Sequence, residues 1–194
     1  RFPVQVLEVG QAFRTLRQHA DEWNVDMDRI VVQGSSAGGH LAACYGVFWN
    51  QDFLLSPLGV KAEEMKPKGI MLSYPVITSD PAYAHMGSFE NLLGEDCGGK
   101  AEQAAIEKLV TETTPPCFIW HTMEDAAVPV ENSLMMTAAL RKAGIPAELH
   151  IFPEGEHGLS LASPIVERAN GAGVQAECAQ WIDLADVWLE RLFA

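Results

Sequence analysis

The sequence predicts an α/β fold in which a mainly parallel β-sheet is covered by helices on both faces. Short β-branched and aromatic runs alternate along the 194 residues with amphipathic segments of helical length, an order typical of strands joined by helical crossovers. The chain is 48% apolar and 20% charged, which is enough apolar surface to bury a core. Neither a repeat nor a linker divides it, so we expect a single domain over residues 1–194.

The first predicted element is a helix over residues 6–23, because its apolar residues recur at spacings of three and four. Asn24 follows as a left-handed cap. The β-branched run 29–33 predicts a buried strand. A Gly-rich turn at 34–39 and an Ala-rich helix over 40–49 come next.

Three further strands are expected at 69–73, 117–120 and 147–152, with a helix over 130–143 and a final amphipathic helix over 178–192. Ligands of parallel sheets bind beyond the carboxyl ends of the strands. The segments that follow the strands are therefore where we expect the functional site.

Charge and cysteine content narrow the function classes. The formal net charge of −13 disfavours phosphate backbones and anionic lipid headgroups as partners. We expect a small, weakly charged substrate and no nucleic-acid or membrane partner. The oligomeric state is left open.

No apolar run reaches the length of a membrane span. No CxxC pair occurs, so neither a zinc site nor a disulfide framework is expected, and Cys44 and Cys117 are expected to pack in the core.

A nucleophile motif follows the first predicted strand. Residues 34–38 read Gly-Ser-Ser-Ala-Gly, and the strand–turn–helix setting is that of a nucleophile elbow. There the hydroxyl of Ser36 is exposed on a sharp turn and the N–H of Ala37 points at the oxyanion of an acyl transfer. An ordinary Gly-rich turn is the alternative; a Walker loop is excluded because no Lys-Ser/Thr follows the glycines. The hydroxyl of Ser35 is expected to point elsewhere, and Ser35 is kept as a candidate substrate contact.

A serine nucleophile needs a histidine to accept its proton. His157 follows the last predicted strand in a loop with Gly155 and Gly158, which leaves the imidazole free to reach the turn. Its position also matches the chain order Ser, acid, His. After the third strand, Asp125 is favoured over Glu124 as the acid, because a shorter side chain is easier to fix against an imidazole. A plain loop histidine and solvated carboxylates are the alternatives.

Residues after other strands complete the predicted site. Tyr74 follows the second strand and His121 ends the third, so both are candidate substrate-binding residues. The segment 74–109 is expected to lie over the site as a cap or pocket insertion. Its candidates for an acyl pocket, or alternatively for the core, are Met86, Phe89 and Leu92.

These motifs resemble the α/β-hydrolase esterases, in the branch that includes acetyl-xylan esterase-like and hormone-sensitive-lipase-like enzymes. The most specific stretch runs from Asp28 through the nucleophile motif to Ala42. Further matching stretches are Tyr74-Pro75-Val76, residues 88–94, Thr114-Pro115-Pro116, Trp120-His121-Thr122, Asp125 with Val128-Pro129, and His157-Gly158. The resemblance implies hydrolysis of carboxylic esters, such as acetylated sugars and short acyl esters, without a metal or organic cofactor. It also supports the three triad roles.

One family feature is absent from the sequence. Family members carry an earlier segment with several strands and a His-Gly-Gly loop that supplies further oxyanion donors, whereas the one His-Gly here is His157-Gly158. We therefore expect an N-terminal portion to be missing and the edge of the first strand to be bare. The isolated chain is expected to be weakly active, insoluble or both. No secretory leader precedes Arg1, which favours the cytoplasm but leaves localisation open.

Two other functions fit the same triad. A serine peptidase of the prolyl-oligopeptidase type shares the triad and its order, although such enzymes usually add a propeller domain. A truncated, inactive hydrolase retained as a binding module is the second.

Overall fold

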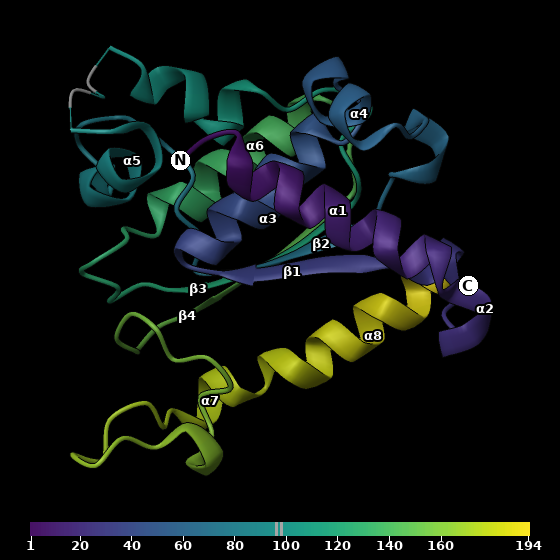
Figure 1. The fold of residues 1–194 in the computed structure, drawn as a ribbon. Coiled ribbons are helices and arrows are strands. Elements are labelled where there is room, and N and C mark those ends of the chain that lie inside the picture. Colours follow the sequence, from purple (N-terminus) through teal and green to yellow (C-terminus); the bar gives the residue numbers. More distant parts are fainter. Residues whose placement is uncertain (96, 98) are drawn as a thin grey trace.

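The strands form one parallel sheet. The computed structural model describes residues 1–95, 97 and 99–194, and its sheet has the order β1-β2-β3-β4 (Figure 1). Every neighbouring pair is parallel, so each connection is a crossover. The predicted α/β class is confirmed. The strands are β1 (Val31–Ser35), β2 (Gly69–Ser73), β3 (Cys117–Thr122) and β4 (Ala147–Phe152).

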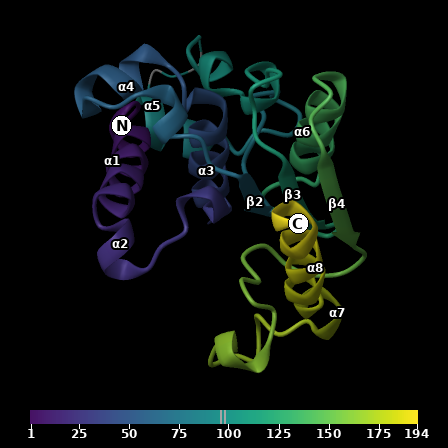
Figure 2. The same cartoon turned by 90° about the vertical axis from the view of Figure 1, so that its right-hand side faces the viewer.

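Helices cover both faces of this sheet. Helices α1, α3 and α6 lie on one face and α8 lies on the other, which the turned view in Figure 2 also shows. The α-helices are α1 (Val4–Gln18), α2 (Ala20–Trp23), α3 (Ala37–Phe48), α4 (Asp52–Leu58), α5 (Met86–Leu93), α6 (Glu131–Lys142), α7 (Ala176–Ala179) and α8 (Trp181–Phe193). Short 3₁₀ turns lie at Met27–Arg29, Ala62–Glu64, Ala101–Ala104, Ile106–Lys108 and Pro164–Val166.

Side chains of the central strands alternate between two cores. Ile70 and Leu72 of β2 pack into the core under α1, α3 and α6. Met71 points the other way and packs with Phe118 and Trp120 against α8. Because both faces are buried, these strands are apolar at nearly every position, which is why the sequence showed them as short uninterrupted runs.

The observed element boundaries differ from the predicted ones mainly near β1. This strand begins two residues later than expected, because the Asp26 carboxylate accepts the Asp28 N–H at 2.9 Å and folds Met27–Arg29 into a 3₁₀ turn. The first predicted helix is interrupted at His19, so it forms α1 and α2. Asn24 ends α2 in the left-handed conformation, as expected, with φ of 54°.

The edge of β1 is open within the described residues, where β1 pairs with β2 alone. The segment 74–109 contains α5, and its residues 96 and 98 lie outside the described residues. All four cysteines are buried and free, and Cys44 and Cys117 pack in the core on the α3 face, as expected. None of the described helices has the length and apolar character needed to cross a bilayer.

Candidate active site

Ser36 occupies a strained turn between sheet and helix. It is the single residue between β1 and α3, and its φ of 56° and ψ of −121° are unusual for a residue with a side chain. Such backbone conformations cost about 1–3 kcal/mol and persist where neighbours enforce them. Here the Ser36 N–H donates to the Ser73 carbonyl at 2.9 Å, and the Ser36 carbonyl accepts from the N–H groups of His40 and Val76 at 3.1 and 3.2 Å. The turn is therefore held in place by β2 and α3.

Two glycines allow the close approach that this turn requires. A Cβ on Gly34 would overlap the backbone carbonyl of Gly38, and a Cβ on Gly39 would come within 2.8 Å of the Pro75 side chain. A Cβ on Gly38 would meet nothing within 4 Å. The motif implies that the turn has no room for a side chain at Gly34 or at Gly38. The structure shows such crowding at Gly34 and at Gly39, but not at Gly38.

The imidazole of His157 links the serine to a carboxylate. Its Nε2 lies 2.7 Å from Ser36 Oγ and its Nδ1 lies 2.6 Å from Asp125 Oδ2. The loop after β4 presents this ring, with Gly155 and Gly158 at φ of 137° and 82°. The His157 side chain is 23% exposed, so it is accessible from solvent. The structure brings together the three residues that the sequence proposed as a triad.

Asp125 is buried, and both oxygens of its carboxylate accept hydrogen bonds. Its Oδ1 accepts the backbone N–H groups of Ala127 and Val128 at 3.0 and 2.8 Å. Burial by itself raises the pKa of Asp125, but hydrogen bonds from His121, His157 and the Val128 N–H outweigh burial and hold that pKa well below its usual range. The carboxylate is therefore charged at neutral pH. Glu124, the alternative acid, is exposed and its Oε2 accepts the Gly155 N–H at 3.3 Å.

Tyr74 lies against the imidazole rather than on a substrate surface. It is 4% exposed, and its ring meets that of His157 edge-on with centroids 5.1 Å apart. Its hydroxyl accepts the Ser160 N–H at 2.9 Å. Its side chain is buried and its hydroxyl is occupied, so Tyr74 packs against His157, and the structure offers no support for its candidate role as a substrate contact.

His121 and Ser35, the other two candidate substrate contacts, have protein partners instead. His121 is completely buried behind Asp125, and a side chain without exposed surface cannot touch a bound molecule. The hydroxyl of Ser35 lies 3.4 Å from the Gln33 amide on β1. This contact gives no support to its candidate role as a substrate contact, and that role stays a prediction.

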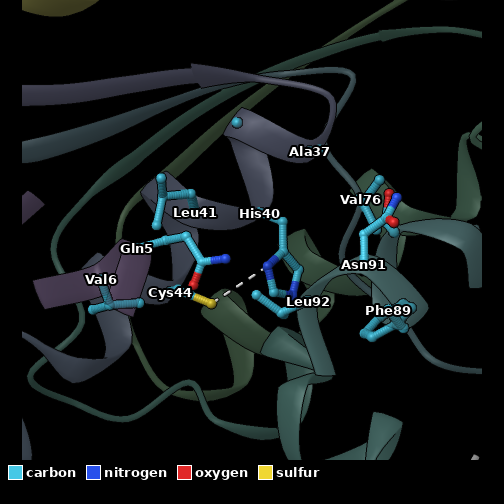
Figure 3. Close-up of a pocket in the computed structure, with 12 residues that line it drawn as sticks. Gln5, Val6, Ala37, His40, Leu41, Cys44, Val76, Phe89, Asn91 and Leu92 are labelled. Atoms are coloured by element: carbon cyan, nitrogen blue, oxygen red, sulfur yellow. Dashed lines mark hydrogen bonds between the residues drawn. The ribbon is translucent and has the colours of Figure 1, made fainter. Parts of the chain in front are cut away.

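A cavity of about 300 Å³ opens beside the N-terminus of α3 (Figure 3). Ala37 lies at this terminus, where the first backbone N–H groups of a helix have no partner inside the helix. The lining is mostly apolar and comes from α1, α3, α5 and Val76. The residues that line it are Gln5, Val6, Ala37, Gly38, His40, Leu41, Cys44, Val76, Ser88, Phe89, Asn91 and Leu92.

Part of this lining was expected from the sequence. Phe89 and Leu92 lie on the cavity, whereas Met86 lines a separate depression near Thr78 and Glu107. Gln5 and its neighbours on α1 were missed, because nothing in the local pattern of that helix shows which other helix it faces.

His40 is a packed residue of the cavity wall. Its Nε2–H donates to the Ala104 carbonyl at 2.8 Å, and its Nδ1 lies 3.4 Å from the Cys44 sulfur. Burial lowers the pKa of His40 despite the opposing hydrogen bond to Ala104. The imidazole is therefore neutral, as suits a structural role. No group of three or more His, Cys, Asp or Glu side chains is placed to hold a metal ion within the part of the chain that the structure describes.

Comparison with known proteins identifies the family. Residues 1–140 match the family model BD-FAE. The chain belongs to the BD-FAE family of α/β hydrolases. This BD-FAE chain is 38% identical over 157 residues to endo-1,4-beta-xylanase B of Butyrivibrio fibrisolvens and 32% identical over 167 residues to acetylxylan esterase of Xylanibacter ruminicola. The resemblance to α/β-hydrolase esterases drawn from the motifs is confirmed.

A solved structure gives the same result. The acetyl ester-xyloside bifunctional hydrolase from Caldicellulosiruptor lactoaceticus is 38% identical, with a TM-score of 0.82 over 99% of this chain and 67% of that chain. The BD-FAE chain matches smaller parts of its curated relatives. The alignments cover 80% of it and 24% of xylanase B, and 82% of it and 32% of the acetylxylan esterase.

Proposed function

We propose that this chain carries the catalytic centre of a carboxylic-ester hydrolase that works by acyl transfer through Ser36, His157 and Asp125. The observation that carries the proposal is the continuous line of hydrogen bonds from Ser36 Oγ through His157 to the buried carboxylate, at 2.7 and 2.6 Å. A nucleophile, a base within hydrogen-bond reach and a group that orients the base are the parts that nucleophilic catalysis requires.

The first half of the reaction acylates the serine. His157 Nε2 takes the proton of Ser36 Oγ as that oxygen bonds to the ester carbonyl carbon. The carbonyl electron pair moves onto its oxygen, and the N–H of Ala37 donates to the resulting oxyanion. When the tetrahedral intermediate collapses, the bond to the alcohol oxygen breaks and His157 gives its proton to the departing alcohol.

The second half releases the acid. Water gives a proton to His157 and attacks the acyl carbon, and collapse of this second intermediate breaks the bond to Ser36 Oγ, which takes the proton back. Asp125 stays ionised throughout, accepts the His157 Nδ1–H and stabilises the imidazolium that forms in each half. The low pKa of Asp125 supports this role.

We place the substrates among acetyl and other short-acyl esters, acetylated sugars included. Two relatives support this choice by their names, an acetylxylan esterase and an acetyl ester-xyloside bifunctional hydrolase. The net charge of −13 disfavours anionic esters. The small, mostly apolar cavity beside Ala37 offers space for part of such a substrate next to the oxyanion donor.

Covalent labelling tests the nucleophile. A fluorophosphonate probe is expected to label the chain on Ser36, and Ser36→Ala abolishes the labelling. Ser35→Ala is the matched control, since it removes the adjacent hydroxyl, and it should leave labelling intact. A chain that folds but stays unlabelled would support an inactive binding module instead.

A substrate panel tests the reaction class. Release of acetate from p-nitrophenyl acetate and from acetylated xylo-oligosaccharides is expected to exceed cleavage of a proline amide by a wide margin. The reverse preference would assign the site to a peptidase of the prolyl-oligopeptidase type. A steep rise in turnover from acetyl to long acyl chains would reject the short-acyl assignment.

A further inference from the structure

A second histidine lies behind the orienting acid. His121 is the fifth residue of β3, four residues before Asp125, and its side chain has no exposed surface. Its Nδ1 lies 2.7 Å from the Ser133 hydroxyl on α6. Its Nε2 lies 2.9 Å from the Val128 carbonyl and 3.3 Å from Asp125 Oδ2. The mechanism above uses neither nitrogen.

These partners determine which nitrogen carries the hydrogen. A carbonyl and an ionised carboxylate can only accept hydrogen bonds. Since Nε2 faces both, this nitrogen must be the donor. The hydroxyl of Ser133 can donate a hydrogen bond, so it donates to Nδ1 on the opposite side of the imidazole. The N–H of His121 is thereby directed at the turn that holds the acid.

The His121 imidazole completes a cycle of hydrogen bonds around the turn from Asp125 to Val128. Asp125 Oδ1 binds the N–H of Val128, and the carbonyl of the same Val128 accepts from His121, which also lies against the other oxygen of Asp125. The turn is thus tied to β3 at both its side chain and its backbone. Without the imidazole, Oδ2 would keep His157 as its partner but the Val128 carbonyl would be buried without a donor.

Besides His157, His121 is the titratable residue that lies close to Asp125 Oδ2. Among the residues that the structure describes, the titratable groups that face Asp125 are His121 from β3 and His157 from the loop after β4. The nearby acids Glu124, Glu154 and Glu156 are exposed on the same loops. On the α6 side, the group that faces His121 is the fully buried hydroxyl of Ser133.

We propose that His121 is a positioning residue for the catalytic acid: its Nε2–H fixes Asp125 and the Val128 turn so that Oδ2 meets His157 Nδ1. This rests on the proposed function, since it assigns His121 a part in that same site. The role is indirect, because His121 touches neither Ser36 nor the space in front of it.

Three substitutions of His121 separate positioning from simple packing. His121→Gln keeps an amide N–H near the place of Nε2. His121→Asn places its amide near Nδ1, where it reaches Ser133 but not Asp125. His121→Leu fills similar volume and donates nothing. If His121 only fills space or bonds Ser133, Leu or Asn serves as well as Gln.

The proposal predicts a rank order in turnover of p-nitrophenyl acetate. We expect kcat to fall about 10- to 100-fold in the Leu and Asn variants, the range typical when a hydrogen-bond partner that orients a metal ligand is lost, and to stay within about fivefold of the original chain in His121→Gln. KM should change little in all three. Equal kcat in the Gln and Asn variants, or an undiminished kcat in His121→Leu, would overturn the proposal.

A magnetic-resonance readout keeps the test independent of turnover. In the chain with ¹⁵N-labelled histidine, the hydrogen-bonded Nδ1–H of His157 gives a far-downfield proton signal. This signal should persist in His121→Gln and broaden or vanish in His121→Leu and in His121→Asn. If the signal behaves so while no ester is cleaved and Ser36 is not labelled, the positioning role stands and the proposed function fails. A His157 signal identical in all variants rejects the positioning role whatever the activity.

Discussion

The ring of Tyr74 meets the imidazole of His157 edge-on, with the ring centroids 5.1 Å apart and the planes at 75°. The Tyr74 hydroxyl also holds the Ser160 N–H, three residues beyond that histidine. Tyr74 therefore packs against the His157 ring and is hydrogen-bonded to the loop that carries it. We therefore expect the 2.7 Å distance between Ser36 Oγ and His157 Nε2 to depend on this packing.

Tyr74→Phe keeps the ring but leaves the Ser160 N–H without its acceptor. We expect the free energy of unfolding to fall by about 0.5–1.5 kcal/mol and kcat to fall severalfold, because the loop that carries His157 loosens. Tyr45→Phe is the matched control: it removes a buried hydroxyl that donates to the Met65 carbonyl at 2.8 Å, far from the site. Urea unfolding and ester turnover of both variants check this. A similar kcat loss in the Tyr45 variant would contradict the assignment.

Asp125→Asn is expected to lower kcat by up to about 10⁴-fold, because an amide favours the wrong tautomer of the catalytic imidazole. Glu124→Gln changes the adjacent, exposed acid and should leave kcat nearly unchanged. Steady-state kinetics on p-nitrophenyl acetate measures both. Equal losses in the two variants would show that the carboxylates were assigned wrongly.

The charge of Asp125 links stability to pH. Its pKa in the folded chain lies below the ordinary value of 3.8, so the unfolded chain binds the proton more readily. The stabilisation is complete above the unfolded pKa and is lost as pH falls toward the folded one. The difference in unfolding free energy between the chain and Asp125→Asn should therefore shrink from about pH 5 downward. Urea titrations from pH 7 to pH 3 test this, and a difference that grows on acidification would refute it.

The two elbow glycines differ in what they tolerate. Gly34→Ala should destabilise the chain by at least about 3 kcal/mol, because its Cβ overlaps the backbone of Gly38. Gly38→Ala has open space around its Cβ and lies in α3, so it should stabilise the helix by about 0.5–1 kcal/mol. Melting temperatures of the two variants compare them directly. Equal effects would mean that the elbow relaxes around Gly34.

Sequence patterns predicted the features of the fold that depend on residues close together in the chain. The strands β2 and β4 lie at the predicted residues because β-branched and aromatic runs between turn residues mark buried strands. Ser36 and His157, which the structure places 2.7 Å apart, were proposed from a strand–turn–helix motif and a glycine-flanked loop. The start of β1 was missed because a side-chain bond from Asp26 decides it.

Tertiary packing decides the features that were missed. His121 near the end of β3 and Tyr74 just after β2 carry polar groups at strand ends, where both substrate contacts and buried supporting residues occur. Whether such a group meets substrate depends on Ser133 and Ser160, which are 12 and 86 residues away. The cavity likewise joins Gln5 and Asn91, which no sequence periodicity connects.

Ser36 follows β1 and His157 lies in the loop after β4, and these are the two outermost strands of the sheet. Three strand spacings separate them, about 14 Å of hydrogen-bonded backbone. Shear or fraying of strands anywhere in the sheet would therefore change the 2.7 Å distance between Ser36 Oγ and His157 Nε2. On gentle heating, ester turnover should fade while the helical circular-dichroism signal is still intact.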